Sequence, residues 1–249
     1  MAKNKQYIRQ KGDQSGYRGN PNADGSNQDD DDTLVDIVEV KEQAQDFFEK
    51  HQNMVIGGLA LVLLLIGGYL AYKYAYHEPR EKAGMEAMYK AEFQFKQDSF
   101  ALALTNPGEG MDGFLDIIDN YSGTKASNLA SYYAGISYLN LGQYEAAIDY
   151  LNDYSAKDDI TPLTKSGALG DAYAETGEFD KALVNYKKAT KSDNGFLTPY
   201  YLNKLGVLNM KQGNNAEALK NFERIEADYP QAMEARDAKK YIALLKSMN

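Results

Sequence analysis

The sequence contains no cysteine and no tryptophan, and only two histidines. Without cysteine the chain has no disulfides, thiolate nucleophiles or zinc–thiolate sites, so its fold depends on packing alone. The histidines, His51 and His77, stand at opposite ends of one long apolar segment, which excludes a shared metal or catalytic pair. No phosphate-binding loop is present, and no GxGxxG follows a strand. The sequence therefore predicts a protein that uses no metal or cofactor and is not an enzyme.

Positive charge is also scarce. The chain carries 27 Lys and Arg against 36 Asp and Glu, for a net charge of −9. It lacks the basic stripe that sequence-independent binding to nucleic acid requires. We expect no specific nucleic-acid partner, and at most a proximity of the N-terminal tail to the ribosome.

The most apolar part of the chain is MVIGGLALVLLLIGGYLAYKYA, residues 54–75, in which Lys73 is the single charge. At 1.5 Å per residue this run spans roughly 33 Å, which matches the hydrocarbon core of a bilayer. About fifty polar residues precede it and no small-residue cleavage site follows, so we interpret residues 54–76 as an uncleaved transmembrane signal anchor. Tyrosines crowd its C-terminal end, as is typical of a membrane interface.

Small residues recur along this segment and would let another helix approach closely. An equal alternative is that glycine is simply common in membrane-spanning helices. The candidate packing residues are Gly57, Gly58, Gly67, Gly68 and Ala71.

Charge leaves the topology open. Lys41 and Lys50 precede the span, whereas four basic residues follow it from Lys73 to Lys90. The positive-inside rule would place the C-terminal part in the cytoplasm. However, the rule weakens when a long folded domain flanks the span, and the N-terminal tail carries five more basic residues.

The N-terminal 53 residues divide into two parts. Residues 1–32 are polar, end in the run Asp29–Asp32 and predict a disordered acidic tail, because they cannot bury enough apolar area to offset chain entropy. Residues 33–53 read as a juxtamembrane amphipathic segment, with Thr33 as a candidate helix cap. The alternation in LVDIVEV, residues 34–40, equally suits a strand.

Self-similarity dominates the remainder of the chain. Gly135, Gly170 and Gly206 are spaced by 35 and 36 residues. Three positions later stand Tyr138, Tyr173 and Asn209; seven later, Gly142, Gly177 and Gly213; twelve later, Ala147, Ala182 and Ala218. Small residues allow two helices to approach, and glycine suits the turn between them. These units resemble tetratricopeptide repeats. Residues 127–249 are expected to form such repeats, with a capping helix over 231–248.

Residues 77–126 are expected to link the span to the repeats. A long helix is predicted over 79–104, leaving the membrane and turning back before Asn106 and Pro107. GFLDIIDNYSGT, residues 113–124, predicts the second helix of a degenerate fourth unit. The predicted fold class is all-α: a disordered N-terminal tail and a single transmembrane helix followed by a TPR-like α-solenoid.

A solenoid of this kind presents a concave surface lined by the first helix of each unit. A mixed aromatic and polar groove suits extended or helical polypeptide. The alternative is that several of these residues pack within the stack. The candidate groove residues are Tyr132, Ile136, Leu139, Asn140, Asp171, Glu175, Tyr200, Asn203, Val207 and Lys211.

Over residues 40–249 the chain resembles the YfgM-like family of ancillary SecYEG translocon subunits. The resemblance lies in FFEKHQ before the span, in the glycine-rich anchor, and in GFLDIIDNYSGTKASNLASYYAG leading into the repeats. The aspartate-rich tail departs from that family's pattern. The resemblance implies a bacterial inner-membrane protein with a cytoplasmic N-terminus and a periplasmic C-terminal domain. Its partners would be SecYEG, a PpiD-type membrane-anchored chaperone and exported polypeptides.

Two other functions remain open from the sequence. One is a scaffold or assembly factor of another envelope machine, such as a secretion or motility complex. The other is an adaptor whose repeat domain faces the cytoplasm.

Overall fold

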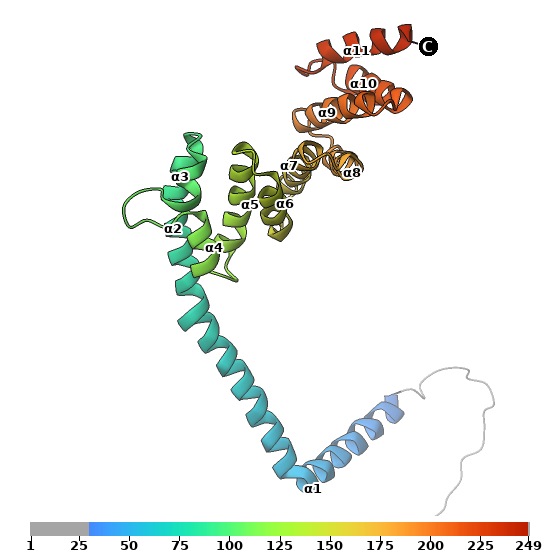
Figure 1. Ribbon diagram of the computed structural model, residues 1–249. Coiled ribbons are helices and arrows are strands. Elements are labelled where there is room, and N and C mark those ends of the chain that lie inside the picture. The colour runs from blue at the N-terminus through green and yellow to red at the C-terminus, as the bar shows by residue number, and fades with distance from the viewer. Residues whose placement is uncertain (1–29, 249) are drawn as a thin grey trace, which may run out of the picture. The chain divides into compact units, whose positions relative to one another are not determined.

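Residues 30–248 are described by the computed structural model, and every regular element among them is a helix (Figure 1). This confirms the predicted all-α class. Of the predicted disordered tail, residues 1–32, residues 1–29 lie outside the described residues, and residues 30–32 belong to a helix, so the prediction was wrong for these three. The chain divides into two compact units, one ending at Ile66 and the other beginning at Gly67.

The first helix, α1 (Asp30–Ala71), is interrupted at His51, where the backbone leaves helical geometry with φ −121° and ψ 22°. The ring of His51 lies 4.8 Å from that of Phe47, measured between centroids. Residues 34–40 are helical, so the strand alternative was wrong. The proposed cap at Thr33 was also wrong, because the helix already includes the aspartates from Asp30 onward.

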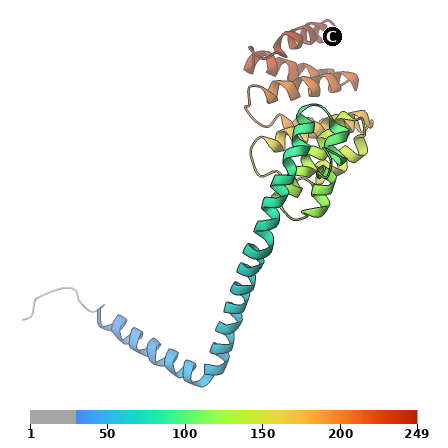
Figure 2. The ribbon, with the colours of Figure 1, turned by 90° about the vertical axis from the view of Figure 1, so that its left-hand side faces the viewer.

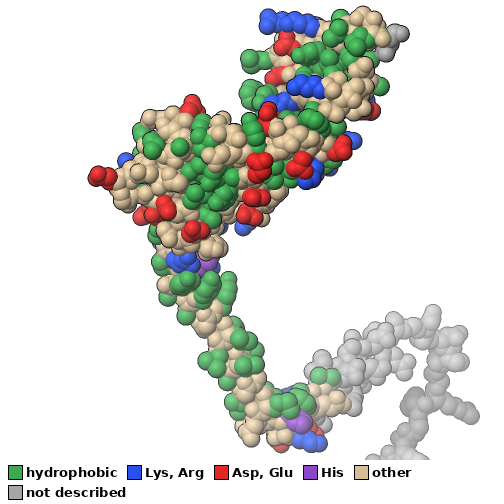
Figure 3. All heavy atoms as spheres, viewed as in Figure 1, with side chains coloured by type: hydrophobic (Ala, Val, Ile, Leu, Met, Phe, Trp, Pro, Cys, Tyr) green, Lys and Arg blue, Asp and Glu red, His purple; other side chains and the backbone are tan. Residues whose placement is uncertain are grey.

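One helical stretch, Gln43–Lys96, is long and apolar enough to cross a membrane, and none of its most apolar window is buried inside the protein. Leu59, Leu63 and Leu64 are each more than half exposed, and hydrophobic side chains are visible along this stretch in Figure 3. The core helix of a soluble domain would bury such residues. Apolar surface of this extent in water is unfavourable at about 25 cal/mol per Å². The helix is therefore compatible with membrane anchoring.

The second unit continues through the π-helix η1 (Tyr72–His77) into a series of α-helices. These are α2 (Glu78–Lys96), α3 (Phe100–Thr105), α4 (Phe114–Asn120), α5 (Lys125–Asn140), α6 (Tyr144–Asp153), α7 (Thr161–Glu175), α8 (Phe179–Ala189), α9 (Leu197–Lys211), α10 (Asn215–Asp228) and α11 (Ala235–Ser247).

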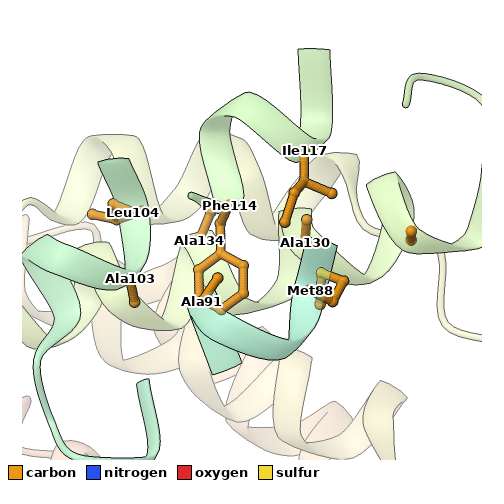
Figure 4. Close-up of a cluster of buried hydrophobic side chains, with 9 residues drawn as sticks. Met88, Ala91, Ala103, Leu104, Phe114, Ile117, Ala130 and Ala134 are labelled. Carbon is orange, nitrogen blue, oxygen red and sulfur yellow. The ribbon is translucent and has the colours of Figure 1, made fainter. Parts of the chain in front are cut away.

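The single helix predicted over 79–104 is instead two helices, α2 and α3. A turn at Gln97–Ser99 separates them, and Asp98 in that turn adopts φ 56°. The break lets α3 fold back so that Ala103 and Leu104 join the core formed with α2, α4 and α5 (Figure 4). A continuous helix could not bury both faces of this segment, which is why periodicity alone misjudged it.

The first core joins the degenerate unit to the first complete repeat. Phe114 of α4 is fully buried, and its ring stacks on that of Tyr133 in α5 with centroids 5.2 Å apart. Glu81 of α2 accepts a hydrogen bond from the backbone N–H of Lys125, which opens α5, at 2.9 Å. The helix predicted over 113–124 is thus present as α4, packed against α5.

Three helical hairpins, α5–α6, α7–α8 and α9–α10, stack in sequence order (Figure 2). The turns within them contain Gly142, Gly177 and Gly213, all in the left-handed region with φ between 72° and 80°. Only glycine enters that region without steric cost. Close helix approach explains Gly206, because a Cβ there would lie 2.6 Å from Cζ of Phe222. The regularly spaced glycines therefore serve the two roles predicted for them, in turns and at close helix contacts.

The helix α11 closes the stack, and it begins later than the predicted residue 231. Ala238, Ile242 and Leu245 pack with Leu202 and Phe222 in the last core cluster. The ring of Tyr241 stacks on that of Phe222 at 4.7 Å between centroids. A terminal helix of this kind keeps the final apolar face out of water.

Candidate interaction surface

A polar cluster centred on Asp171 of α7 includes residues of α8 and α9. Its Oδ1 accepts a hydrogen bond from the hydroxyl of Tyr186 at 2.6 Å. Nζ of Lys204 donates to both carboxylate oxygens, at 2.6 and 2.8 Å. Lys204 also lies over the ring of Tyr200, 4.9 Å from its centroid. The cluster therefore ties α7, α8 and α9 together.

The contact with Asp171 keeps Lys204 charged despite partial burial. Burial alone lowers the pKa of Lys204, but the charge of Asp171 and its hydrogen bond outweigh that effect and raise the pKa above its usual value. Burial, with the nearby Asp171 carboxylate, also raises the pKa of the Tyr186 phenol. Lys204 is therefore charged and Tyr186 neutral at physiological pH, and together they hold the carboxylate in one geometry.

A second polar link joins α5 to α7. The hydroxyl of Tyr132 donates to Oγ1 of Thr164 at 2.9 Å, and the ring of Tyr132 lies 5.1 Å from that of Tyr154. Lys165 of α7 donates to the backbone carbonyl of Tyr154 at 2.6 Å. Burial lowers the pKa of this lysine. These contacts fix the relative positions of neighbouring repeats.

The structure separates the ten predicted groove residues into three groups. Tyr132, Ile136, Leu139 and Val207 are partly buried and pack against the core clusters, as the packing alternative expects. Asp171 and Asn203 are half-buried. The exposed members are Asn140, Glu175, Tyr200 and Lys211. Binding by any of these residues stays a prediction.

Asn203 is the one half-buried member with an unmet hydrogen-bonding need. Among the side chains that the structure describes, its Oδ1 is the single buried oxygen or nitrogen without a hydrogen-bond partner. A buried acceptor without a donor costs about 1–3 kcal/mol.

The sequence interpretation missed Lys204 and Tyr186. Lys204 stands four residues after Tyr200 and thus on the same helix face, so helical spacing could have identified it. Tyr186 lies on a second helix, α8, and reaches Asp171 only because Gly170 leaves room: a Cβ on Gly170 would lie 2.5 Å from the Tyr186 ring. Spacing along one helix gives no sign of that contact.

The small residues of the anchor are open in the structure. A Cβ placed on Gly57, Gly58, Gly67 or Gly68 would meet no heavy atom within 4 Å, and Ala71 is exposed. Their use in helix packing stays a prediction.

The repeat domain is expected to lose stability at alkaline pH. Burial raises the pKa of both Tyr186 and Tyr201 in the folded chain, whereas the unfolded phenol ionises near pH 10. A raised folded pKa means that the stabilisation is complete below about pH 10 and declines as the pH rises further. The raised pKa of Lys204 acts in the same direction, with its loss beginning above about pH 10.4.

Thermal melting followed by circular dichroism would therefore give a lower Tm at about pH 11 than at about pH 9. Tyr186→Phe should make that fall shallower, because it removes one phenol, while the exposed Tyr89→Phe should leave it unchanged. Equal melting temperatures at about pH 9 and about pH 11 would contradict the raised pKa values of these buried groups.

Comparison with known families identifies the repeats. Tetratricopeptide repeat models match residues 129–158 and residues 168–233. The first match covers most of α5 and α6, and the second runs from within α7 past the end of α10. The chain therefore contains tetratricopeptide repeats, which generally imply protein partners. A comparison with curated proteins finds no match to this chain.

Proposed function

We propose that this chain is a membrane-anchored tetratricopeptide-repeat protein that acts as an ancillary subunit of the Sec translocon. It recruits a PpiD-type membrane-anchored chaperone and assists exported polypeptides. The observation that carries the proposal is that one chain combines an exposed apolar helix with tetratricopeptide repeats. The resemblance to the YfgM-like family supplies the particular partners.

The surface around Tyr200 is suited to polypeptide. Tyr200 is 40% exposed and offers an aromatic face at the surface. Lys204 and Asp171 hold each other and so do not need a ligand to remain stable. A rigid surface with few unsatisfied groups loses little entropy when a partner binds.

In this proposal the N-terminus is cytoplasmic and the repeat domain periplasmic. Protease added to intact spheroplasts should then digest residues 77–249. Protection of that domain until the membrane is lysed would instead favour the cytoplasmic adaptor.

Photo-crosslinking in cells tests the partners. A crosslinking amino acid at Gly58 or Gly68 should trap translocon subunits, and one at Tyr200 or Glu175 should trap the chaperone or an exported chain. Lys239, exposed on α11, serves as the matched control position. Enrichment of another envelope machine at Gly58 and Gly68 would overturn the translocon assignment in favour of the scaffold. Equal amounts of the same crosslinked partner at Tyr200 and at Lys239 would overturn the surface around Tyr200 as the binding site.

A further inference from the structure

A groove lies between α8 and α10, on the second helices of two successive repeats. Its volume is about 670 Å³. Leu183, Val184 and Lys187 line it from α8, while Leu202, Leu205 and Asn209 of α9 line it between the two flanking helices. Glu217, Lys220, Asn221 and Arg224 line it from α10. Asp171, Tyr200 and Lys204 of the polar cluster are not among its lining residues.

The groove is open because of a departure from the repeat pattern at Asn209. The equivalent residue in the preceding unit is Tyr173, which packs against the buried cluster of Leu151, Ala168 and Leu169. In the unit before that, the equivalent Tyr138 stacks on Tyr150 at 5.3 Å between ring centroids. Asn209 is much smaller, and its amide turns back to donate to the carbonyl of Leu205 at 2.9 Å. The space that a tyrosine fills in the earlier unit is therefore left between α8 and α10.

The charge around this groove is opposite to that of the whole chain. Three cationic side chains, Lys187, Lys220 and Arg224, line it together with one carboxylate, that of Glu217. Arg224 lies 3.4 Å from Asp228. Lys187 and Lys220 have no carboxylate partner within the part of the chain that the structure describes. Beside them Val184 is 54% exposed, so apolar surface and unpaired cations adjoin.

We propose that this groove is a second polypeptide-binding site, which takes an acidic amphipathic helix from a partner protein. The lining residues on each flanking helix extend over two turns, from Leu183 to Thr190 and from Glu217 to Arg224. At 1.5 Å per residue that gives a contact length of roughly 10 Å, enough for two turns of a bound helix. The apolar face of the bound helix contacts Leu183 and Val184, and its carboxylates pair with Lys187 and Lys220.

Fluorescence anisotropy with the full-length protein in detergent micelles tests this site. The probe is a labelled helical peptide of about 15 residues, with leucines on one face and glutamates beside them. Saturable binding that weakens as salt is raised is expected. The same peptide with lysine in place of glutamate should bind at least tenfold more weakly. Equal binding of the two peptides would overturn the proposal.

Two variants locate the site. Asn209→Tyr restores the residue of the earlier repeats, so it should preserve the fold and abolish binding by filling the groove. Lys187→Glu with Lys220→Glu should weaken binding at least tenfold without touching the core. Lys188→Glu with Lys239→Glu makes the same change in net charge on exposed positions outside the groove lining, and should leave affinity unchanged.

If both charge-reversal pairs weaken peptide binding equally, the proposed site is wrong. That result would show that the peptide responds to the overall charge of the protein and not to this groove. Tight binding retained by a folded Asn209→Tyr variant would defeat it as well. Neither outcome affects the crosslinks expected at Tyr200, so the two surfaces are tested separately.

Discussion

Replacing both Leu63 and Leu64 with aspartate is expected to release the protein from membranes. These residues lie at the centre of the apolar segment and are 68% and 73% exposed. An aspartate at the middle of a spanning helix costs about 2.5–3.5 kcal/mol on the insertion scale, so two cost about 5–7 kcal/mol. Alkaline carbonate extraction followed by fractionation measures the effect: the variant should move to the soluble fraction while the parent protein stays in the pellet.

The matched control is Leu63→Ala with Leu64→Ala, which shortens the same side chains without adding charge and should remain in the pellet. The repeats should fold equally in all three proteins, because neither leucine contributes to the core clusters. Extraction of the parent protein by carbonate would show that the helix does not span a bilayer.

Phe222→Ala is expected to destabilise the C-terminal repeats by about 3–5 kcal/mol. The side chain is fully buried, stacks on Tyr241 and lies against Gly206, so its removal leaves a cavity among α9, α10 and α11. In a stack of repeats each unit depends mainly on its neighbours, so the loss concentrates at this end of the domain. Urea unfolding of the full-length protein in detergent, followed by circular dichroism, measures it.

Phe196→Ala provides the control, because that ring is 74% exposed and its loss should change the free energy of unfolding by no more than about 0.5 kcal/mol. A second measurement tests the contact with Gly206. Gly206→Ala alone places a methyl group against the Phe222 ring and should destabilise the protein. Added to Phe222→Ala, the same methyl enters the cavity and should recover part of the loss. A cost for Phe222→Ala no larger than that for Phe196→Ala would refute this picture of the core.

The repeats could be predicted from the sequence because single residues at regular spacing mark their turns and helix contacts. Gly142, Gly177 and Gly213 occupy left-handed turns that other residues enter only at a cost, so their spacing marks the hairpins. The break between α2 and α3 had no such marker: Asp98 takes the positive φ there, and the driving force is the burial of Ala103 and Leu104 against another helix. Helical periodicity predicts that one face of a helix is buried. It does not identify the element against which that face packs.

The same distinction applies to the surfaces. The sequence by itself determined a helical repeat domain joined to one long apolar helix, because turn glycines, small contact residues and an uncharged run are local properties of the chain. Only the tertiary structure decided that Lys204 of α9 and Tyr186 of α8 meet Asp171 of α7, and that Asn209 leaves a groove where Tyr173 fills one. Those contacts join residues on different helices, and their distances depend on how the hairpins stack.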